Sequence, residues 1–89
     1  MEWHHIVEQC QAKPSRSGFS ISDINTKANV RATPREVNEE ISAFYSSKPE
    51  FAGGKTVRDW LNGKSYDEQL EFGLKKWEEY MIEFGYSID

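Results

Sequence analysis

The two histidines of this chain stand side by side as His4 and His5, near its beginning. A neutral imidazole nitrogen binds divalent transition ions, and free imidazole titrates near neutral pH. One histidine of such a pair can hold a cation while the other takes a proton from water. Hydrolysis of a phosphodiester needs both functions. Successive side chains on a regular strand point to opposite faces, so the pair can serve one site only where a strand ends or bulges.

Two asparagines favour this interpretation, because amide side chains can support such a site from nearby elements. Asn29 precedes a predicted helix, and Asn38 lies nine residues later, on the second turn of that helix. An asparagine in a loop can bridge backbone groups with its donors and its acceptor. An asparagine on a helix can offer its carbonyl oxygen to a hard cation. The simpler alternatives are a turn residue at Asn29 and a solvated helix position at Asn38.

The elements that must position these residues are predicted from apolar spacing and helix caps. Aromatic and β-branched residues at 3–7 indicate a strand. A loop over 10–23 and a second short strand or turn near 29–31 follow. The stretch Thr33-Pro34-Arg35-Glu36 predicts a capping box at the start of a helix. Its predicted buried face consists of Val37, Ile41, Phe44 and Tyr45.

Two further helices are predicted to follow. A short one begins with a capping-box-like Thr56–Asp59, and the longest one begins with the capping box Ser65–Glu68. The apolar stripe of the longest helix is Leu70, Leu74, Trp77, Met81 and Phe84. We expect this stripe to pack in the core rather than to hold a cofactor, and we expect Trp3 to be a core anchor. The fold class is therefore α+β, with a small ββα element followed by two additional helices.

Composition sets limits on the function. A chain of 89 residues forms one domain. No stretch approaches the roughly 20 apolar residues of a membrane span, so no membrane segment is expected, and no secretory signal is recognisable. The single cysteine, Cys10, excludes an internal disulfide and a thiolate zinc cluster. We expect its thiol to be a small buried hydrophobe.

The charge is unevenly distributed. The net charge of −4 argues mildly against binding to nucleic acid. Residues 1–58, however, hold eight Lys or Arg and seven Asp or Glu, whereas residues 59–89 hold three and eight. The histidine end is thus locally basic, and the acidic residues collect in the last helix, where they are best explained as a solvated helix face.

Taken together, these features resemble the HNH, or ββα-metal, nuclease motif. That motif has a His-His strand, an asparagine before a helix, and a histidine or asparagine nine residues later. The segments WHHIVEQ, GFSISDINTKANV, REVNEEISAFYSSK and TVRDWLNGKSYDEQLEFG resemble HNH-type toxin domains at the C-termini of Rhs and other polymorphic bacterial toxins. The resemblance covers about residues 3–73. It implies that residues 1–89 are a single HNH-like nuclease toxin domain and the C-terminal part of a larger protein.

The resemblance implies a role for four residues. His4 ligates a divalent metal ion, and His5 is the general base. Asn29 holds the loop and orients the base. Asn38 stands where relatives often have histidine, and it completes the metal site. Because asparagine is a weaker ligand for borderline ions, Mg²⁺ or Mn²⁺ is favoured over Ni²⁺ or Zn²⁺.

The implied activity is that of an endonuclease that hydrolyses phosphodiester bonds, with DNA favoured over RNA. It would be a secreted or delivered effector acting in the cytoplasm of a target bacterium, and its partner would be a cognate immunity protein. Glu8 is a secondary candidate for assisting the site. The predicted nucleic-acid contacts are Lys13, Arg16, Lys27, Arg31 and Arg35. The alternative is a catalytically degenerate HNH-like domain that acts as a protein- or nucleic-acid-binding module.

Overall fold

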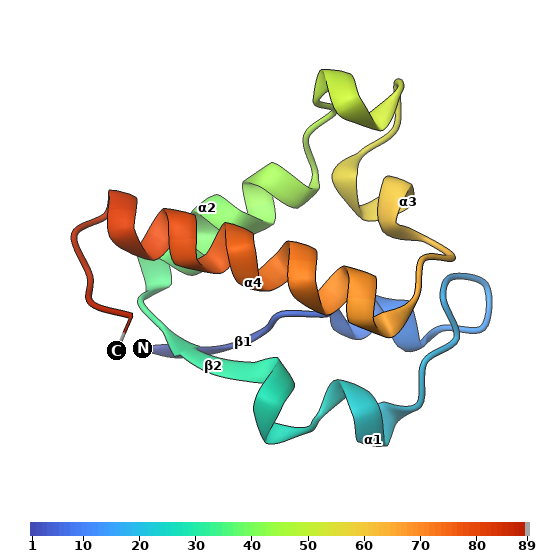
Figure 1. Cartoon of the computed structure of the whole chain (residues 1–89), viewed down its shortest axis with the longest axis horizontal. Helices are drawn as coiled ribbons and strands as arrows, with labels where there is room; N and C mark the ends of the chain where they lie inside the picture. Colours follow the sequence, from blue (N-terminus) through green and yellow to red (C-terminus); the bar gives the residue numbers. More distant parts are fainter. Residues whose placement is uncertain (89) are drawn as a thin grey trace.

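Two short strands begin the fold, and the chain between them makes a long excursion. Strands β1 (Glu2–His5) and β2 (Val30–Thr33) pair antiparallel in a two-stranded sheet, with His4 opposite Arg31 (Figure 1). The structure is a computed structural model and describes residues 1–88. The sheet and the helices described below confirm the predicted α+β class.

The connection between the strands is less irregular than predicted. It contains the 3₁₀ helices η1 (Gln9–Ala12) and η2 (Lys27–Asn29) and the single-turn helix α1 (Ile21–Ile24). The hydroxyl of Ser20 accepts a hydrogen bond from the Asp23 N–H at 3.1 Å and caps α1. Ser20, which lies in the stretch 10–23 predicted as a loop, is therefore the N-cap of a helical turn.

Three α-helices and one 3₁₀ turn follow the sheet. Helix α2 (Arg35–Tyr45) leads into η3 (Glu50–Ala52), the short helix α3 (Val57–Leu61) and the long helix α4 (Tyr66–Glu83). In Figure 1, α4 lies in front of α2, and the two strands run below it. The order of a two-stranded sheet followed by helices agrees with the predicted sequence of elements.

All three predicted helices form, and two of their three predicted caps are confirmed. The Ser65 hydroxyl accepts from the Glu68 N–H at 3.1 Å, and the Glu68 carboxylate accepts from the Ser65 N–H at 3.3 Å. This reciprocal pair is the predicted capping box. The hydroxyl of Thr56 likewise accepts from the Asp59 N–H at 3.1 Å and caps α3.

The predicted capping box at Thr33 is wrong. Thr33 is the last residue of β2 and is completely buried, and the N-cap of α2 is Pro34, without a side-chain cap. The hydroxyl oxygen of Thr33 accepts the indole N–H of Trp77 at 2.9 Å. Because a buried indole needs a hydrogen-bond partner, this tertiary contact occupies the hydroxyl that the local pattern assigned to the helix end.

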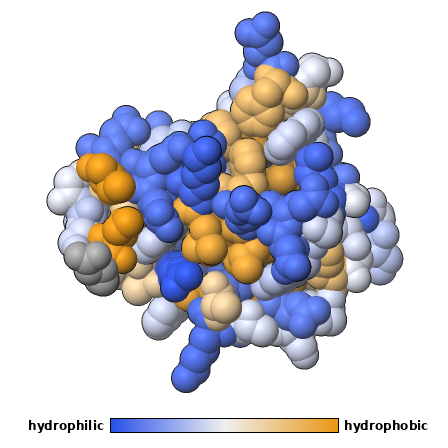
Figure 2. Space-filling view, in the orientation of Figure 1, coloured by the Kyte–Doolittle hydropathy of each residue, from blue (hydrophilic) through white to orange (hydrophobic). Residues whose placement is uncertain are grey.

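The core lies between α2, α3, α4 and the chain that leaves β1. Its buried cluster consists of Ile6, Val37, Ile41, Tyr45, Val57, Leu61, Trp77 and Met81. Figure 2 shows hydrophilic side chains over much of one face, with a hydrophobic patch near its middle. None of the helices in residues 1–88 combines the length and the apolar composition needed to cross a lipid bilayer.

The predicted apolar stripe of α4 packs against the core over most of its length. Trp77 and Met81 are buried, and Leu70 and Leu74 are partly buried against the same cluster. Phe84 is the exception, because its side chain is 41 % exposed. The fully buried positions toward the start of the helix are Gln69 and Gly73, so the centre of the buried face is partly polar.

Trp3 was predicted to anchor the core, and this prediction is wrong. Its side chain is 73 % exposed. On the regular strand β1 the side chains of Glu2 and His4 share one face, and those of Trp3 and His5 share the other. The core side of the sheet therefore receives His4, while Trp3 stands on the outer side.

Candidate metal and nucleic-acid site

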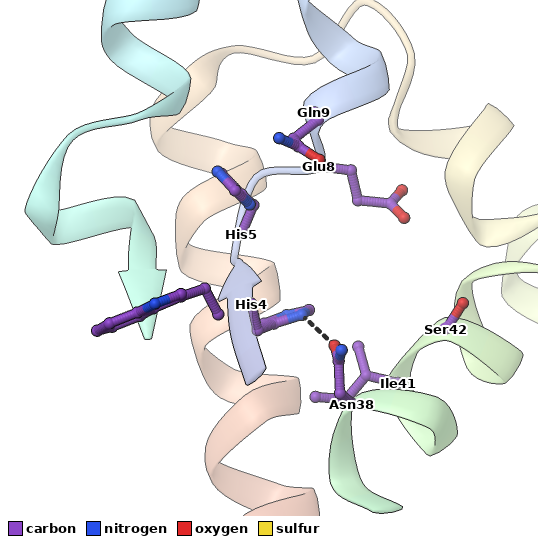
Figure 3. A pocket seen from close by; sticks show the side chains of 8 residues that line it. His4, His5, Glu8, Gln9, Asn38, Ile41 and Ser42 are labelled. Atoms are coloured by element: carbon purple, nitrogen blue, oxygen red, sulfur yellow. Dashed lines mark hydrogen bonds between the residues drawn. The ribbon is translucent and has the colours of Figure 1, made fainter. Parts of the chain in front are cut away.

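His4 and Asn38 meet where β1 faces the second turn of α2 (Figure 3). His4 Nδ1 lies 2.9 Å from Asn38 Oδ1, and Asn38 Nδ2 donates to Glu2 Oε1 at 2.7 Å. A carboxylate can only accept, so the contact with Glu2 assigns the nitrogen end of the amide. The amide oxygen is then directed at the imidazole, and His4 Nδ1 donates in this geometry.

The protonation of His4 is set mainly by its position inside the fold. Burial lowers the pKa of His4, the hydrogen bond to Asn38 opposes this shift, and the neighbouring His5 lowers the pKa further. The net direction is downward. The ring is therefore neutral at neutral pH, which is the form that can ligate a metal ion.

His5 does not join His4 and Asn38. It points away from Asn38, and its Nε2 lies 3.0 Å from Asn25 Oδ1 (Figure 3). The strand keeps its register through His5, so the two rings emerge on opposite faces, as a regular strand requires. Both histidines nevertheless border a single pocket of about 220 Å³, which Glu8, Asn38 and Ser42 also line.

Asn29 lies at the base of the connection between the strands. None of its side chain is exposed. Its Oδ1 accepts from the Val7 N–H at 2.7 Å, and its Nδ2 donates to the carbonyl oxygens of Val7 at 3.0 Å and Ile24 at 2.8 Å. The side chain therefore ties the segment after β1 to the end of α1. His5 is therefore not held by Asn29. Its hydrogen-bond partner is Asn25, to which the sequence analysis gave no role. The sequence offered one hint of this residue, which is a second asparagine four positions before Asn29.

The predicted nucleic-acid contacts do not form one surface. Lys27 lies beside His5, in a pocket that Asn25 also lines. Lys13 is exposed in the connection. Arg16 is directed instead at α3, where it pairs with Asp59 at 3.1 Å.

Arg31 on β2 and Arg35, the first residue of α2, are also engaged within the fold. The guanidinium carbon of Arg31 lies 5.7 Å from the ring centre of Trp77, and its Nε is buried without a hydrogen-bond partner among the described residues. Arg35 pairs with Glu39 one helical turn further on, at 3.0 Å. The structure therefore places Lys27 beside His5 and Arg31 opposite His4 in the sheet, whereas Lys13 lies in the connection and Arg16 and Arg35 pair with carboxylates.

Glu8, the secondary candidate, has a strong partner of its own. Its carboxylate accepts from Arg58 at 2.8 Å, which joins the chain after β1 to α3. This hydrogen bond raises the pKa of Arg58. Glu8 still borders the pocket, but its charge is balanced by Arg58.

Cys10 was expected to be buried, and it is only partly buried. Burial raises the pKa of its thiol.

The donors present can be compared with what a metal ion needs. Within residues 1–88 no three His, Cys, Asp or Glu side chains gather closely enough to hold an ion. The donor pair is instead one imidazole nitrogen and one amide oxygen, 2.9 Å apart. Two ligands at about 2.1 Å from one octahedral ion, at a right angle, are about 3.0 Å apart. This spacing equals that of adjacent ligands, but in this geometry His4 Nδ1 holds its proton for the hydrogen bond to Asn38, so ligation through Nδ1 requires the tautomer that carries the proton on Nε2.

Comparison with known proteins finds no match for this chain among protein families, curated proteins or solved structures. The fold class thus rests on the structure, and the likeness to HNH toxin domains rests on the residues quoted above.

Proposed function

We propose that this chain is a divalent-metal-dependent endonuclease of the HNH, or ββα-metal, type that acts as a bacterial toxin effector domain on DNA. The observation that supports the proposal most strongly is the approach of His4 Nδ1 and Asn38 Oδ1 to 2.9 Å at a pocket that His5 also borders. The two donors come from the first strand and the following helix, which is the arrangement that the resemblance implies.

The chemistry divides between the two faces of β1. His4 and Asn38 would hold the divalent cation, which would supply positive charge beside the phosphate and the departing 3′ oxygen. His5 accepts the proton of the attacking water. Because Asn25 Oδ1 can only accept, His5 Nε2 donates to it, and the nitrogen that remains free to take a proton is Nδ1.

The small donor set favours certain ions. Two protein donors leave most positions of an octahedral ion to water and to phosphate oxygens of the substrate, as is common for Mg²⁺. Mg²⁺ or Mn²⁺ is therefore favoured, with Ni²⁺ or Zn²⁺ as weaker alternatives. Glu2 holds the Asn38 amide through its nitrogen, which keeps the oxygen directed toward His4.

The second candidate function is a catalytically degenerate HNH-like module that binds protein or nucleic acid. Two observations favour it. His4 and His5 point to opposite faces of β1, and two of the five predicted phosphate-binding cations, Arg16 and Arg35, are paired with carboxylates of this chain. The two functions differ in one measurable respect, which is cleavage.

The test is incubation of the purified chain with plasmid DNA, and in parallel with RNA, in Mg²⁺, Mn²⁺, Ni²⁺ or Zn²⁺, with and without EDTA. We expect nicking of DNA with Mg²⁺ or Mn²⁺ that EDTA abolishes. Removal of a general base reduces the rate roughly 10²–10⁴-fold, so His5→Ala should lose that factor. Asn62→Ala, an exposed amide remote from the histidines in sequence, is the control and should retain the parent rate.

Metal titration by calorimetry tests the donor pair separately. Asn38→His should strengthen binding of Ni²⁺ and Zn²⁺ by about ten-fold or more, because imidazole is the better ligand for these ions. His4→Ala should abolish metal binding.

Expression of the chain in a bacterium tests the toxin role. We expect it to arrest growth, and we expect His5→Ala to restore growth. A folded parent that nicks with no ion, or a His5→Ala variant as fast as the parent, would contradict the proposal.

A further inference from the structure

The outer face of the sheet carries an aromatic side chain that nothing in the core explains. Trp3 is 73 % exposed and stands opposite Ala32 on β2, a residue too small to cover an indole. Large exposed apolar side chains beside a pocket commonly mark a binding surface. The exposed indole of Trp3 therefore indicates a binding surface for a ligand that packs against an aromatic ring.

Trp3 borders a shallow pocket with polar and charged residues at its edge. This pocket has a volume of about 590 Å³ and is lined by Trp3, His5, Asn25, Lys27 and Val30. It lies within the usual size range of small-ligand sites, about 300–1,000 Å³. Trp3 and His5 also border the smaller pocket at Asn38, so the two hollows adjoin along β1.

The charge of this pocket distinguishes it from the other aromatic hollows of the molecule. Its described lining holds one cation, Lys27, and no carboxylate. The hollows around Trp60 and Phe72 are lined by lysines but also by glutamates. An aromatic platform with a cation and no opposing carboxylate is complementary to a base and its phosphate.

We propose that the outer face of the sheet is a binding subsite for single-stranded nucleic acid, in which a base stacks on Trp3 and Lys27 contacts the phosphate backbone. The inference rests on the proposed function, because it places the bound strand beside His5. In a duplex the bases are stacked on one another and cannot reach an indole. The substrate class is therefore single-stranded or locally unpaired nucleic acid.

The test is fluorescence anisotropy with a labelled oligonucleotide of about ten nucleotides, compared with its duplex, in EDTA so that no cleavage intervenes. We expect the single strand to bind more tightly. One stacked base accounts for roughly a five- to hundred-fold change in affinity, so Trp3→Ala should weaken binding by about ten-fold and Trp3→Phe much less. Lys27→Ala should reduce the salt dependence. Phe51→Ala, a 50 % exposed aromatic in η3, is the matched control and should leave binding unchanged.

Three results would overturn the inference. They are a Trp3→Ala variant that binds like the parent, a duplex bound as tightly as the single strand, and a parent dimer that Trp3→Ala dissociates in sedimentation. Trp3-dependent binding without metal-dependent cleavage would overturn the proposed nuclease and keep this subsite. Metal-dependent cleavage with oligonucleotide binding indifferent to Trp3 would do the reverse. Circular dichroism of Trp3→Ala checks that the variant is folded.

Discussion

The side chain of Asn29 makes three hydrogen bonds with the backbone of Val7 and Ile24, and none of it reaches solvent. Through these bonds one amide fixes the exit of β1 relative to the entry of β2. An alanine there would leave one N–H and two carbonyl oxygens without their partner in a buried place. Unsatisfied buried groups of this kind are costly, because water cannot replace the lost bond.

Asn29→Ala should lower the free energy of unfolding by about 2–4 kcal/mol, since each buried polar group left unpaired costs roughly 1–3 kcal/mol. Urea denaturation followed by circular dichroism measures this. Asn62→Ala is the control. It removes an exposed amide whose oxygen accepts a hydrogen bond from Arg16, and it should change the free energy of unfolding by less than about 0.5 kcal/mol. Equal losses for the two variants would show that Asn29 does not hold the connection.

For single residues, the sequence showed which side chains could do chemistry better than it showed what would surround each of them. The expectation that Asn38 meets His4 came from the resemblance to the HNH motif, and the two side chains do lie 2.9 Å apart. The exposure of Trp3 did not, because alternation along a strand tells which side chains share a face but not which face is covered. The hydroxyl of Thr33 was assigned locally, and Trp77, far along the chain, occupies it.

Helix α4 shows what determines how closely two elements approach. A Cβ atom built on Gly73 would lie 2.7 Å from the carbonyl oxygen and from Cγ2 of Ile6, and 3.2 Å from the Tyr45 hydroxyl. One of these neighbours is backbone and cannot turn aside. The glycine therefore lets α4 lie directly against the chain that leaves β1.

Gly73→Ala should destabilise the fold, although alanine favours a helix by about 1 kcal/mol over glycine. The overlap with Ile6 must push α4 or the strand exit outward, and forced overpacking costs roughly 1–3 kcal/mol. We therefore expect a lower thermal midpoint, measured by circular dichroism. Glu78→Ala, on the exposed side of the same helix, should leave the midpoint nearly unchanged. A higher midpoint for Gly73→Ala would refute the close approach.

The elements were predictable where their signals are local. The start of α4 depends on Ser65 and Glu68 alone, and it was found. The burial of Gln69 was not predicted, because it depends on hydrogen bonds from its amide to Leu61, Lys64 and Ser17, which lie outside α4. A sequence pattern predicts such polar residues to be exposed to solvent, because it does not show their hydrogen-bond partners in other elements.

The whole molecule is small, and its parts share one core. The Cα radius of gyration is 12.7 Å, close to the roughly 12 Å of a compact chain of this length. Ile6 joins the exit of β1 to the same cluster that α2, α3 and α4 build. No described element has a separate core on which to remain folded.

The chain should therefore unfold in a single transition. We expect urea curves from far-ultraviolet circular dichroism, which follows the helices, to coincide with those from tryptophan fluorescence. Trp77 reports on the junction of sheet and helix through its bond to Thr33. Since Trp3 is exposed in the folded chain, Trp3→Phe should leave the fluorescence midpoint where it was. Separate midpoints would mean that the strands and the helices come apart independently.

Asn29 holds together the two ends of the connection between β1 and β2, and this affects where the chain can accept additional residues. With the strands joined at that point, residues farther out along the excursion have no part in setting their register. The exposed stretch Lys13–Ser15 lies at such a distance, and each doubling of a loop adds only about 0.6 kcal/mol of closure entropy. It is accordingly the place where extra residues, or a grafted tag, can enter the hairpin while His4, His5 and Asn38 keep their positions.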